Sequence, residues 1–446
     1  MDFFLPIIFG LAYGIIVGSA PGLGVLGAIL LVLPLMQYFD SLQVLLFYAA
    51  LTSTVQYIGS VVAIYFGVPG EHTSLIASKL GHSMATRHST LLTSLIVGTA
   101  IGSFIAALIG LLVIAAVMIT TTDITWISGF FVKIFLLLLV LTVLLRYRNQ
   151  SVHVNFLLVA LGFFLGSLGL GPISMFNWTF GQDWLISGVN QYLLIMMLFV
   201  FPNFYWTWHN HAKTTSLSTI RKKVAINTKA LLRRWHSIIR GSTLGAFAGL
   251  IPGVGTSISS QMAYDVETRI SKKPIQQLLA AESANNAAVL TVLIPLIVLG
   301  MPIIASEALI LDLVTFKGTV VGLQWFLSES AFGLSNIAAL MLGLLIVNIL
   351  AFFVSWRLAP ALAYWYQLIP LKVFIVFLIL LLTGLLVYNS VMMFTYYSDI
   401  IIALCLTPLM IYITAKKIDS LPLVFAFMLA TQLHSVIAAA ISFIIF

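Results

Sequence analysis

The sequence predicts an all-α polytopic membrane protein made of two related halves, and three observations carry this prediction. Of the 446 residues, 61% are hydrophobic and only 8% are charged, whereas a soluble domain carries roughly 25% charged residues to cover its surface. Five stretches without Asp, Glu, Lys or Arg each exceed the ~20 apolar residues that cross a bilayer as a helix. They are residues 3–39, 41–70, 89–122, 373–398 and 420–446. A glycine–proline pattern also occurs twice.

The net charge of +8 is concentrated in segment 205–240. This segment holds eight Lys and Arg residues and no Asp or Glu, so it accounts for the whole basic excess of the chain. Trp206, Trp208 and Trp235 flank it, as aromatic residues do at a headgroup boundary. Because basic loops stay in the cytoplasm, we predict a cytoplasmic or interfacial linker on the lipid surface, between a first repeat (1–204) and a second repeat (241–446). Binding of nucleic acid or of a regulator is the alternative interpretation.

Apolar runs between the remaining basic residues predict the other membrane spans. Since cytoplasmic basic markers separate these runs, the runs must cross the membrane in pairs. The predicted spans of the first half are 89–119, 126–145, 152–170 and 184–204. Those of the second half are 331–354, 373–389, 391–414 and 421–445.

The most specific pattern in the chain is G-x3-G-x2-P-G-x-G, which occurs at 14–24 and again at 245–255. A second marker follows each copy, Gly67-Val68-Pro69-Gly70 in the first half and Gly300-Met301-Pro302 in the second. The two prolines of each half are 48 and 50 positions apart. This matched spacing indicates an internal repeat.

Flanking charges predict how the repeats are oriented. Arg240 and Arg269 flank the second motif, which suggests a hairpin that enters and leaves from the cytoplasm. Only Asp2 and Asp40 flank the first motif, so its ends are predicted outside. Each half then has one re-entrant hairpin, one interrupted span and four further spans. Five membrane crossings separate corresponding positions of the two halves. Because this number is odd, the two repeats have opposite orientations in the membrane. The total is ten crossings, or twelve if the hairpins cross the membrane as broken helices.

The Pro-Gly breaks predict a binding site. Proline removes a backbone N–H and glycine permits unusual backbone angles, and the freed polar groups must be buried in protein or line a wet cavity. Paired discontinuous helices in inverted halves are typical of the midplane site of a transporter. The alternative is a set of packing kinks.

Hydroxyl and amide side chains surround these breaks and suit a small carboxylate or a small hard cation. Exposed helix starts attract carboxylates, and exposed carbonyl ends with Ser, Thr and Asn oxygens suit Na⁺. The substrate-binding candidates are Pro21, Gly22, Gly24, Ser53, Thr54, Tyr57, Gly59, Ser60, Pro252, Gly253, Gly255, Thr256, Ser257, Asn285 and Asn286. Gln56 and Ser283 lie among them. The alternative for Asn285 and Asn286 is a bond between adjacent helices.

Few acidic residues lie near the predicted membrane. Buried ionisable groups are costly and often functional, so Glu282 is the first candidate for ion coupling and Glu307 the second. Asp265, Glu267 and Asp312 are expected at the membrane boundary. We expect no cofactor and no resident metal, with Na⁺ or H⁺ as the coupling ion.

Enzyme motifs are missing from the sequence. It contains no HExxH, GxSxG or GxxxxGK[ST], its eight His residues are scattered, and its one cysteine, Cys405, lies in an apolar run. The start Met1-Asp2-Phe3-Phe4 lacks the basic region of a cleavable signal, so we expect the first segment to be retained. A membrane-embedded transferase is therefore the least favoured alternative.

The repeat cores resemble the TctA family, the large permease subunit of bacterial tripartite tricarboxylate transporters. The matching segments of the first half are 18–24, 57–60 and 68–70. Those of the second half are 240–241, 249–255, 264–274, 282–288, 294–296 and 299–302. The chain departs from the family pattern at Lys79–Met84, where an acidic-glycine block is usual, and at Pro302-Ile303-Ile304, where Pro-Gly-Ser is usual.

This resemblance implies ion-coupled secondary active uptake of small carboxylates, such as tricarboxylates or dicarboxylates, across the bacterial inner membrane by alternating access. It also implies two partners, a small membrane subunit and a periplasmic solute-binding protein. No nucleic-acid partner is expected, because the distribution of the basic residues argues against one. The alternatives are a channel or a non-transporting scaffold subunit.

Overall fold

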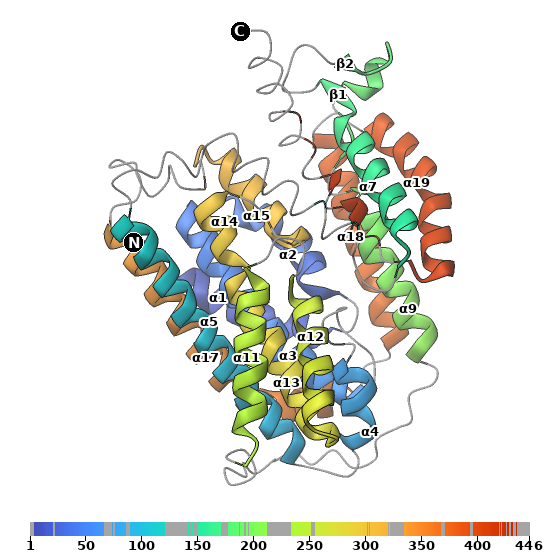
Figure 1. Cartoon of the computed structure of the whole chain (residues 1–446). Helices are drawn as coiled ribbons and strands as arrows, with labels where there is room; N and C mark the ends of the chain where they lie inside the picture. The colour runs from blue at the N-terminus through green and yellow to red at the C-terminus, as the bar shows by residue number, and fades with distance from the viewer. Residues whose placement is uncertain are drawn as a thin grey trace. The chain divides into compact units, whose positions relative to one another are not determined.

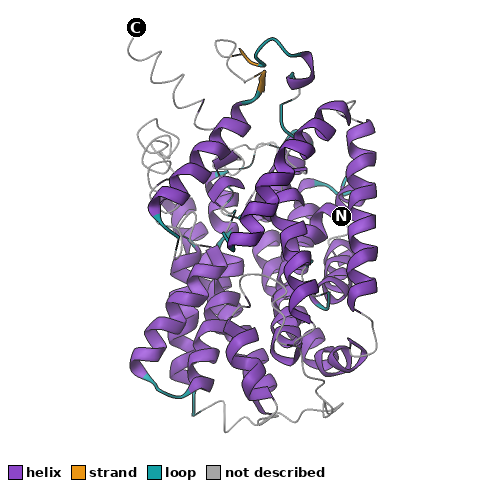
Figure 2. Ribbon diagram, turned by 90° about the vertical axis from the view of Figure 1, so that its right-hand side faces the viewer, coloured by secondary structure: helices purple, strands orange, loops and turns teal. Residues whose placement is uncertain are grey.

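A computed structural model gives the fold of the chain. The described residues are 4–20, 23–66, 74, 76–85, 90–120, 141, 145, 150–170, 177–186, 188–190, 193–194, 196–211, 233–250, 255–300, 302, 304–319, 321, 334–366, 371–392, 396–418, 420, 422–424, 426–427, 430 and 434. They are helical almost throughout (Figure 2), which confirms the predicted all-α membrane class. Among them, the one pair of strands is β1 (Gly169–Leu170) with β2 (Asn177–Trp178), antiparallel and two residues long.

The chain packs as two compact units, and each unit takes segments from both predicted repeats. Unit 1 comprises Met1–Thr121 and Trp206–Phe374, and unit 2 comprises Thr122–Tyr205 and Ile375–Phe446. Compact units need not coincide with sequence repeats, because repeated segments can exchange packing partners. The division at 1–204, 205–240 and 241–446 therefore stays a prediction.

Unit 1 holds the two repeat cores (Figure 1). Its first-half elements are α1 (Phe4–Gly18), α2 (Gly24–Met36), α3 (Ser41–Phe66), the π-helix η2 (Ala77–Gly81), α4 (His82–Ala85) and α5 (Thr90–Thr120). Its second-half elements are α11 (Trp235–Gly249), α12 (Gly255–Ile270), α13 (Pro274–Thr291), α14 (Leu293–Leu299), α15 (Ala305–Phe316) and α17 (Leu334–Tyr366).

Unit 2 contains α7 (Val152–Ser167), the two strands, η4 (Asp183–Leu185), η5 (Met196–Val200) and α19 (Tyr396–Lys416). The boundaries between the units fall inside α9 (Phe201–His211) and α18 (Leu371–Met392). Within this unit, α7 packs closely on the C-terminal segment. A methyl group on Gly162 would lie 2.2 Å from the carbonyl oxygen of Leu423.

Helices stop and restart around both copies of the glycine–proline motif. In the first half α1 ends at Gly18 and α2 begins at Gly24, and in the second α11 ends at Gly249 and α12 begins at Gly255. The prolines themselves, Pro21 and Pro252, lie outside the described residues, as do Gly22 and Gly253. The structure therefore has helix ends where the sequence places the breaks, while the re-entrant hairpin geometry stays a prediction.

The second Pro-Gly marker also coincides with a helix interruption. α14 ends at Leu299, and Gly300 adopts a left-handed backbone conformation (φ 64°) in which its N–H donates to the carbonyl of Leu296 at 3.0 Å. This is a common helix stop, because glycine tolerates positive φ without a Cβ clash. α15 then starts at Ala305. In the first half, Pro69 and Gly70 fall outside the described residues, between α3 and η2.

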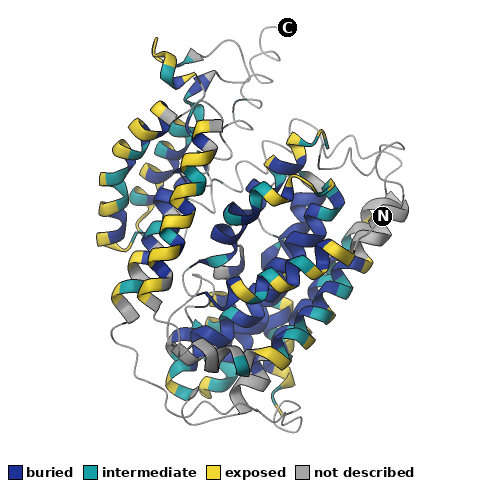
Figure 3. Ribbon diagram, turned by 180° about the vertical axis from the view of Figure 1, so that it is seen from behind, coloured by how far each residue is buried: buried dark blue, intermediate teal, exposed yellow. Residues whose placement is uncertain are grey.

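Three helices in the described part of the chain are long and apolar enough to cross a membrane. They are Ser41–Ile64, Pro274–Ile297 and Tyr397–Lys416. The most apolar stretch of each of the first two is 94% and 100% buried inside the protein, against 28% for the third. Figure 3 shows this contrast as dark blue against yellow ribbon. The first two are thus interior helices, whereas most residues in the apolar stretch of the third are not buried inside the protein.

Shorter apolar helices account for further predicted spans. They are Phe4–Gly18, Gly24–Met36, Val97–Val113, Val152–Ser167, Leu342–Leu358 and Ile375–Tyr388. The predicted spans at 126–145 and 421–445 lie largely outside the described residues. The total of ten to twelve crossings therefore stays a prediction.

Glycines let the first helix of each repeat core approach the long interior helix. Methyl groups on Gly241 and Gly245 of α11 would each lie 2.1 Å from a carbonyl oxygen of α13, that of Ala280 or Ala284. On α1, a methyl group on Gly10 would lie 2.6 Å from the carbonyl oxygen of Phe47 in α3. Gly14 and Gly18 continue the α1 ladder, and Gly249 continues the α11 ladder. The same four-residue register therefore appears in both halves of the chain.

The two halves also exchange packing partners inside unit 1. Helix α5 of the first half packs on α13 of the second, and α17 of the second half packs on α3 of the first. Gly102 of α5 lies against the carbonyl of Ser283, and Gly343 of α17 lies against the side chain of Leu46. Each interior helix is thus enclosed by helices from both halves.

Candidate functional site

Buried polar side chains gather where α3 meets α13, and we call this cluster the polar seam. Its α3 members are Ser53, Gln56, Tyr57 and Ser60, and its α13 members are Glu282, Ser283, Asn285 and Asn286. Their exposed fractions range from 0% to 7%. Residues three and four apart share a helix face, so Ser53, Gln56, Tyr57 and Ser60 share one face of α3. Glu282, Asn285 and Asn286 likewise share one face of α13.

Hydrogen bonds join these faces directly. The Ser60 hydroxyl donates to Glu282 Oε2, and Asn285 Nδ2 donates to Gln56 Oε1 at 2.9 Å. The later residue of α3 pairs with the earlier residue of α13, so the two helices run in opposite directions at this contact. The seam therefore connects the interior helix of one half to that of the other.

Several polar atoms in and beside the seam have no hydrogen-bond partner among the described residues. They are Ser53 Oγ, Thr54 Oγ1, Glu282 Oε1, Ser283 Oγ, Asn285 Oδ1 and Asn286 Nδ2. Leaving one such buried group unsatisfied costs about 1–3 kcal/mol, and native proteins rarely accept this without a reason. Several of them together make the seam the candidate site in the described part of the chain, and the binding of a ligand there stays a prediction.

Neighbouring helices hold α3 in position around the seam. The Tyr57 hydroxyl donates to Ser103 Oγ of α5 at 3.0 Å. Nine residues earlier along the helix, the hydroxyls of Tyr48 and Ser306 lie 2.9 Å apart, which links α3 to the start of α15. Sequence reasoning did not select Ser103, which is far from every Pro-Gly motif, or Ser306, although Ser306 follows Pro302 by four residues as Thr256 follows Pro252.

The chain matches the tripartite tricarboxylate transporter TctA family over residues 4–425. It belongs to the TctA family. The resemblance seen in the repeat cores is thus confirmed over nearly the whole chain, and the family is one of transporter subunits rather than enzymes.

Two relatives from Agrobacterium vitis are similar to this TctA protein. One, an uncharacterized 52.8 kDa protein in the TAR-I ttuC′ 3′ region, is 27% identical over 359 residues, which cover 76% of this chain and 69% of the relative. The other, an uncharacterized protein in the TAR-II ttuC′ 3′ region, is 35% identical over 113 residues, covering 24% of this chain and 47% of the relative. No solved structure matches the TctA chain.

Some predicted site residues of the TctA chain face α1 instead of α13. A methyl group on Gly14 would lie 2.7 Å from Thr54 Cβ, which places Thr54 against α1. A methyl group on Gly59 would lie 4.0 Å from the carbonyl oxygen of Gly18 in α1. The substrate-binding role of Thr54 and Gly59 stays a prediction, and their packing gives each a structural role as well.

The remaining candidates lie around the motif that separates the hairpin helices. Gly24 and Gly255 are the first residues of α2 and α12, and Thr256 is 6% exposed. Ser257 follows in the first turn of α12, and its side chain is outside the description. These positions fit the predicted helix starts, and their role in binding stays a prediction.

Glu307 occupies a helix start. It is the third residue of α15, it is fully buried, and its Oε2 lies 3.4 Å from the Ile304 amide nitrogen, the donor of a long hydrogen bond. A carboxylate in the first turn interacts favourably with the helix dipole. This position gives Glu307 a structural role, and its predicted part in ion coupling is untested.

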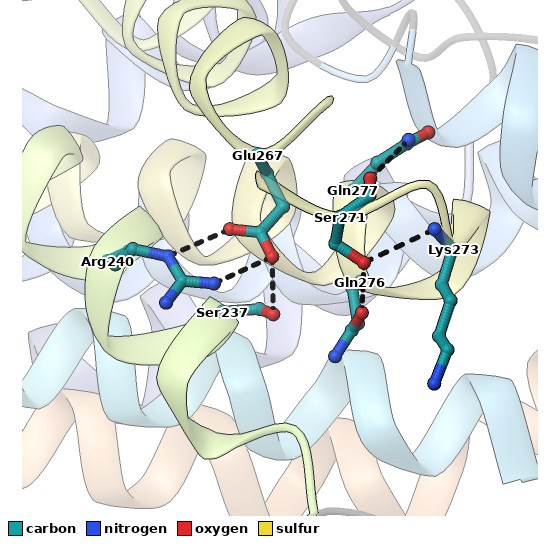
Figure 4. Close-up of polar contacts among 7 residues, drawn as sticks. All are labelled: Ser237, Arg240, Glu267, Ser271, Lys273, Gln276 and Gln277. Carbon is teal, nitrogen blue, oxygen red and sulfur yellow. Dashed lines mark hydrogen bonds and ion pairs between the residues drawn. The ribbon is translucent and has the colours of Figure 1, made fainter. Parts of the chain in front are cut away.

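Glu267 joins the two hairpin helices through a buried ion pair (Figure 4). Arg240 of α11 donates from Nε to Glu267 Oε2 at 3.0 Å and from Nη2 to Oε1 at 2.8 Å, and the Ser237 hydroxyl adds a bond of 2.7 Å. Glu267 is fully buried and Arg240 is 35% exposed. We call this set the hairpin clasp. From the sequence, Arg240 and Glu267 were predicted as separate residues at the membrane boundary. Only the fold shows that they form an ion pair.

The turn after the clasp is held by side chains of its own. Lys273 donates its amide to Ser271 Oγ at 3.2 Å, the Ser271 hydroxyl donates to Gln276 Oε1, and Gln277 Nε2 donates to the Ser271 carbonyl at 2.8 Å (Figure 4). These bonds fix how α12 passes into α13. The clasp and the turn therefore connect the hairpin to the helix that carries Glu282 and Asn285.

Proposed function

We propose that this protein is the permease subunit that carries small carboxylates, such as tricarboxylates or dicarboxylates, across the bacterial inner membrane by ion-coupled alternating access. The observation that carries the proposal is the polar seam. Membership of a transporter family gives the general activity, and the seam is where two interior helices bring buried, incompletely bonded polar atoms together. A polar solute that crosses the membrane needs such a place.

The chemistry of the seam suits a carboxylate that binds together with a cation. Asn286 Nδ2 is a buried donor without a partner among the described residues, as a carboxylate ligand requires. The helix starts at Gly24 and Gly255 offer backbone N–H groups next to the Pro-Gly motifs. Neither α3 nor α13 contains a Lys or Arg. A bound anion would therefore rely on dipoles and on a co-bound cation for charge balance.

The two compact units support alternating access as the transport mode. Rigid-body movement of one unit requires that each unit holds together by itself. Unit 1 contains the polar seam and the helix ends around both motifs, and unit 2 contains α7 and α19. We propose that unit 1 carries the substrate while unit 2 forms the other moving part or the support.

The partners follow from the family name. Tripartite transporters have three components, so we propose that this permease works with a small membrane subunit and a periplasmic solute-binding protein. The binding protein would deliver the carboxylate from the outer side of the inner membrane.

Counterflow tests the proposal. The permease is purified with its partners, reconstituted in vesicles preloaded with unlabelled citrate or succinate, and labelled acid is added outside. We expect transient accumulation of label, because a carrier exchanges its substrate. Leakage without accumulation would indicate a channel, and no movement with any tested acid would indicate a scaffold subunit.

Asn285→Ala, or replacement of Pro252 and Gly253 by alanines, should abolish counterflow while membrane insertion remains normal. The matched control is Asn348→Ala, which removes a buried amide of α17 that bonds to its own helix at Leu344. This control should retain most uptake. Full uptake by both site variants would rule out the proposed site.

A further inference from the structure

We infer that the base of the α11–α12 hairpin binds an anionic phospholipid, with basic side chains on the headgroup phosphate and exposed apolar side chains along the acyl chains. The hairpin base comprises residues 233–240, at the start of α11, and residues 265–273, at the end of α12 and in the following turn. This site lies outside the polar seam and does not depend on the proposed function. It also goes beyond the predicted linker on the lipid surface, because it assigns the residues that hold one lipid.

The fold brings the two basic stretches of the hairpin base to one level. Ser237 and Arg240 of α11 both bond to Glu267 of α12, far from the motif that separates the two helices. The helices therefore run in opposite directions. Because a helix rises by 1.5 Å per residue, residue 233 lies level with residue 271, one turn beyond the clasp.

The packing of α11 on α13 gives the same alignment independently. A methyl group on Gly241 would lie 2.1 Å from the carbonyl oxygen of Ala280, and this contact repeats four residues further along both helices. The two helices thus run in the same direction with a constant offset. The same offset places Arg234 level with Lys273, so basic residues from both stretches meet at one end of the hairpin.

The hairpin base carries an excess of positive charge. It holds six Lys and Arg residues against two acidic residues, which gives a net charge of +4. Arg240 neutralises Glu267 in the clasp, and the other acidic residue, Asp265, accepts a hydrogen bond from Gln261. In Figure 4 the ammonium end of Lys273 points away from the clasp. The exposed basic residues that form no ion pair with a described residue are Arg233, Arg269, Lys272 and Lys273. Their side chains are therefore available to an anion.

Exposed apolar side chains continue from this basic end along both helices. They are Trp235 and Ile239 on α11 and Met262, Val266 and Ile270 on α12, and they are 37% to 57% exposed. On each helix these residues are four positions apart, so they form one stripe. A phospholipid has the same two-part chemistry, with a charged phosphate above apolar chains. The stripes therefore favour a lipid over a soluble anion.

A lipid headgroup at this place would bridge segments that only the folded hairpin brings together. Arg233 precedes α11, whereas Lys272 and Lys273 lie in the turn between α12 and α13. Basic pockets between membrane helices bind phospholipid headgroups in this way. A ligand that binds only the folded state stabilises it by an amount that grows with ligand concentration. Anionic phospholipid should therefore raise the thermal stability of the purified protein.

The test is thermal unfolding of the full chain in a neutral detergent, with phosphatidylglycerol or phosphatidylcholine added in increasing mole fraction. We expect a saturable rise in Tm with phosphatidylglycerol that phosphatidylcholine does not give. Lys272→Gln together with Lys273→Gln should raise the half-saturating mole fraction by about tenfold or more, because each basic residue near anionic lipid strengthens binding about fivefold. The matched control is Lys416→Gln together with Lys417→Gln. It removes the same charge from the exposed end of α19 and should keep the wild-type half-saturation.

Two soluble probes separate a lipid site from a site for any phosphate. Glycerol phosphate and inorganic phosphate carry the charge of the headgroup without acyl chains, so neither should raise Tm at the concentration of phosphatidylglycerol that saturates the response. A rise with either probe equal to the rise with the lipid would overturn the lipid assignment.

Three further outcomes would contradict the inference. Equal responses to the two phospholipids would show that the headgroup charge is not recognised. An undiminished response of the Lys272 and Lys273 variant would show that the lipid binds elsewhere, and an equal loss in the control would show that only net charge matters. If the Lys272 and Lys273 variant does not fold, Arg233→Gln together with Arg269→Gln replaces it, and a wild-type half-saturation there would refute the site.

Discussion

At the scale of single residues, glycine decides how closely the helices of unit 1 approach. On α11, Gly241 and Gly245 leave no room for a methyl group against α13 backbone carbonyls, whereas Gly384 on α18 has nothing within 4 Å of such a group. The sequence showed the repeated Gly-x3-Gly spacing, but spacing alone does not separate a packing glycine from a permissive one. That distinction depends on which backbone lies opposite.

Gly245→Ala should destabilise the protein by about 1–3 kcal/mol, because the added methyl would lie 2.1 Å from the Ala284 carbonyl oxygen and the helices would have to move apart. Thermal unfolding in detergent measures this. Gly384→Ala is the control and should leave Tm unchanged or slightly raised, since its site is open. An equal Tm for both variants would mean that α11 and α13 are not in close contact.

At the scale of elements, α11 and α12 are joined at one end by the hairpin clasp and are separated at the other end by the Pro-Gly motif. The hairpin clasp joins α11 to α12, and the turn around Ser271 leads α12 into α13. The sequence located the interruption, because proline and glycine act locally on the backbone. It did not locate the clasp, because Arg240 and Glu267 are 27 positions apart and their pairing depends on two helices folding back on each other.

Arg240→Ala should destabilise the hairpin by up to about 3 kcal/mol. The substitution leaves the fully buried Glu267 carboxylate without its cation, and the partial exposure of Arg240 limits the loss through solvent screening. Proteolytic susceptibility of the 233–270 region and Tm report the effect.

Arg240→Lys should recover only part of the stability, because a lysine cannot form the two parallel bonds that the guanidinium makes. Asp265→Asn, on the same helix as Glu267, is the control and should have little effect, since Asp265 is exposed and its side chain accepts a hydrogen bond from the Gln261 amide. Loss of stability in Asp265→Asn equal to that in Arg240→Ala would contradict the assigned role of the clasp.

At the scale of the whole molecule, the two halves of the sequence complete each other. In unit 1, α5 covers α13 and α17 covers α3. In unit 2, α7 lies against the C-terminal segment at Leu423, and Asn190 bonds to Asp399 of α19. Repeats that are sequential along the chain are thus interleaved in space, and neither half contains a complete set of packing partners.

Fragments 1–220 and 221–446 should therefore fold only together. Each fragment expressed alone should be degraded or aggregate, because its interior helix would expose the polar seam to lipid. Co-expressed fragments should co-purify and show counterflow. A bulky substitution at Gly102, which lies against the Ser283 carbonyl, should weaken co-purification. A fragment that unfolds cooperatively by itself at the Tm of the intact chain would contradict the interleaved packing.

The sequence by itself determined the membrane class, the family and the positions of the helix breaks. Composition, apolar run length and Pro-Gly motifs act through local physics, namely the transfer of side chains to lipid and the backbone angles that proline and glycine permit. It also identified Glu282, Asn285 and Ser60 as candidates, because polar residues inside apolar runs are conspicuous.

Only the tertiary structure decided which of these residues meet. It paired Ser60 with Glu282 and Gln56 with Asn285, turned Thr54 toward α1, and joined Arg240 to Glu267. The physical reason is that a helix has several faces with similar composition. Which face is buried against which neighbour depends on contacts between segments more than 200 positions apart, and no local pattern encodes that choice.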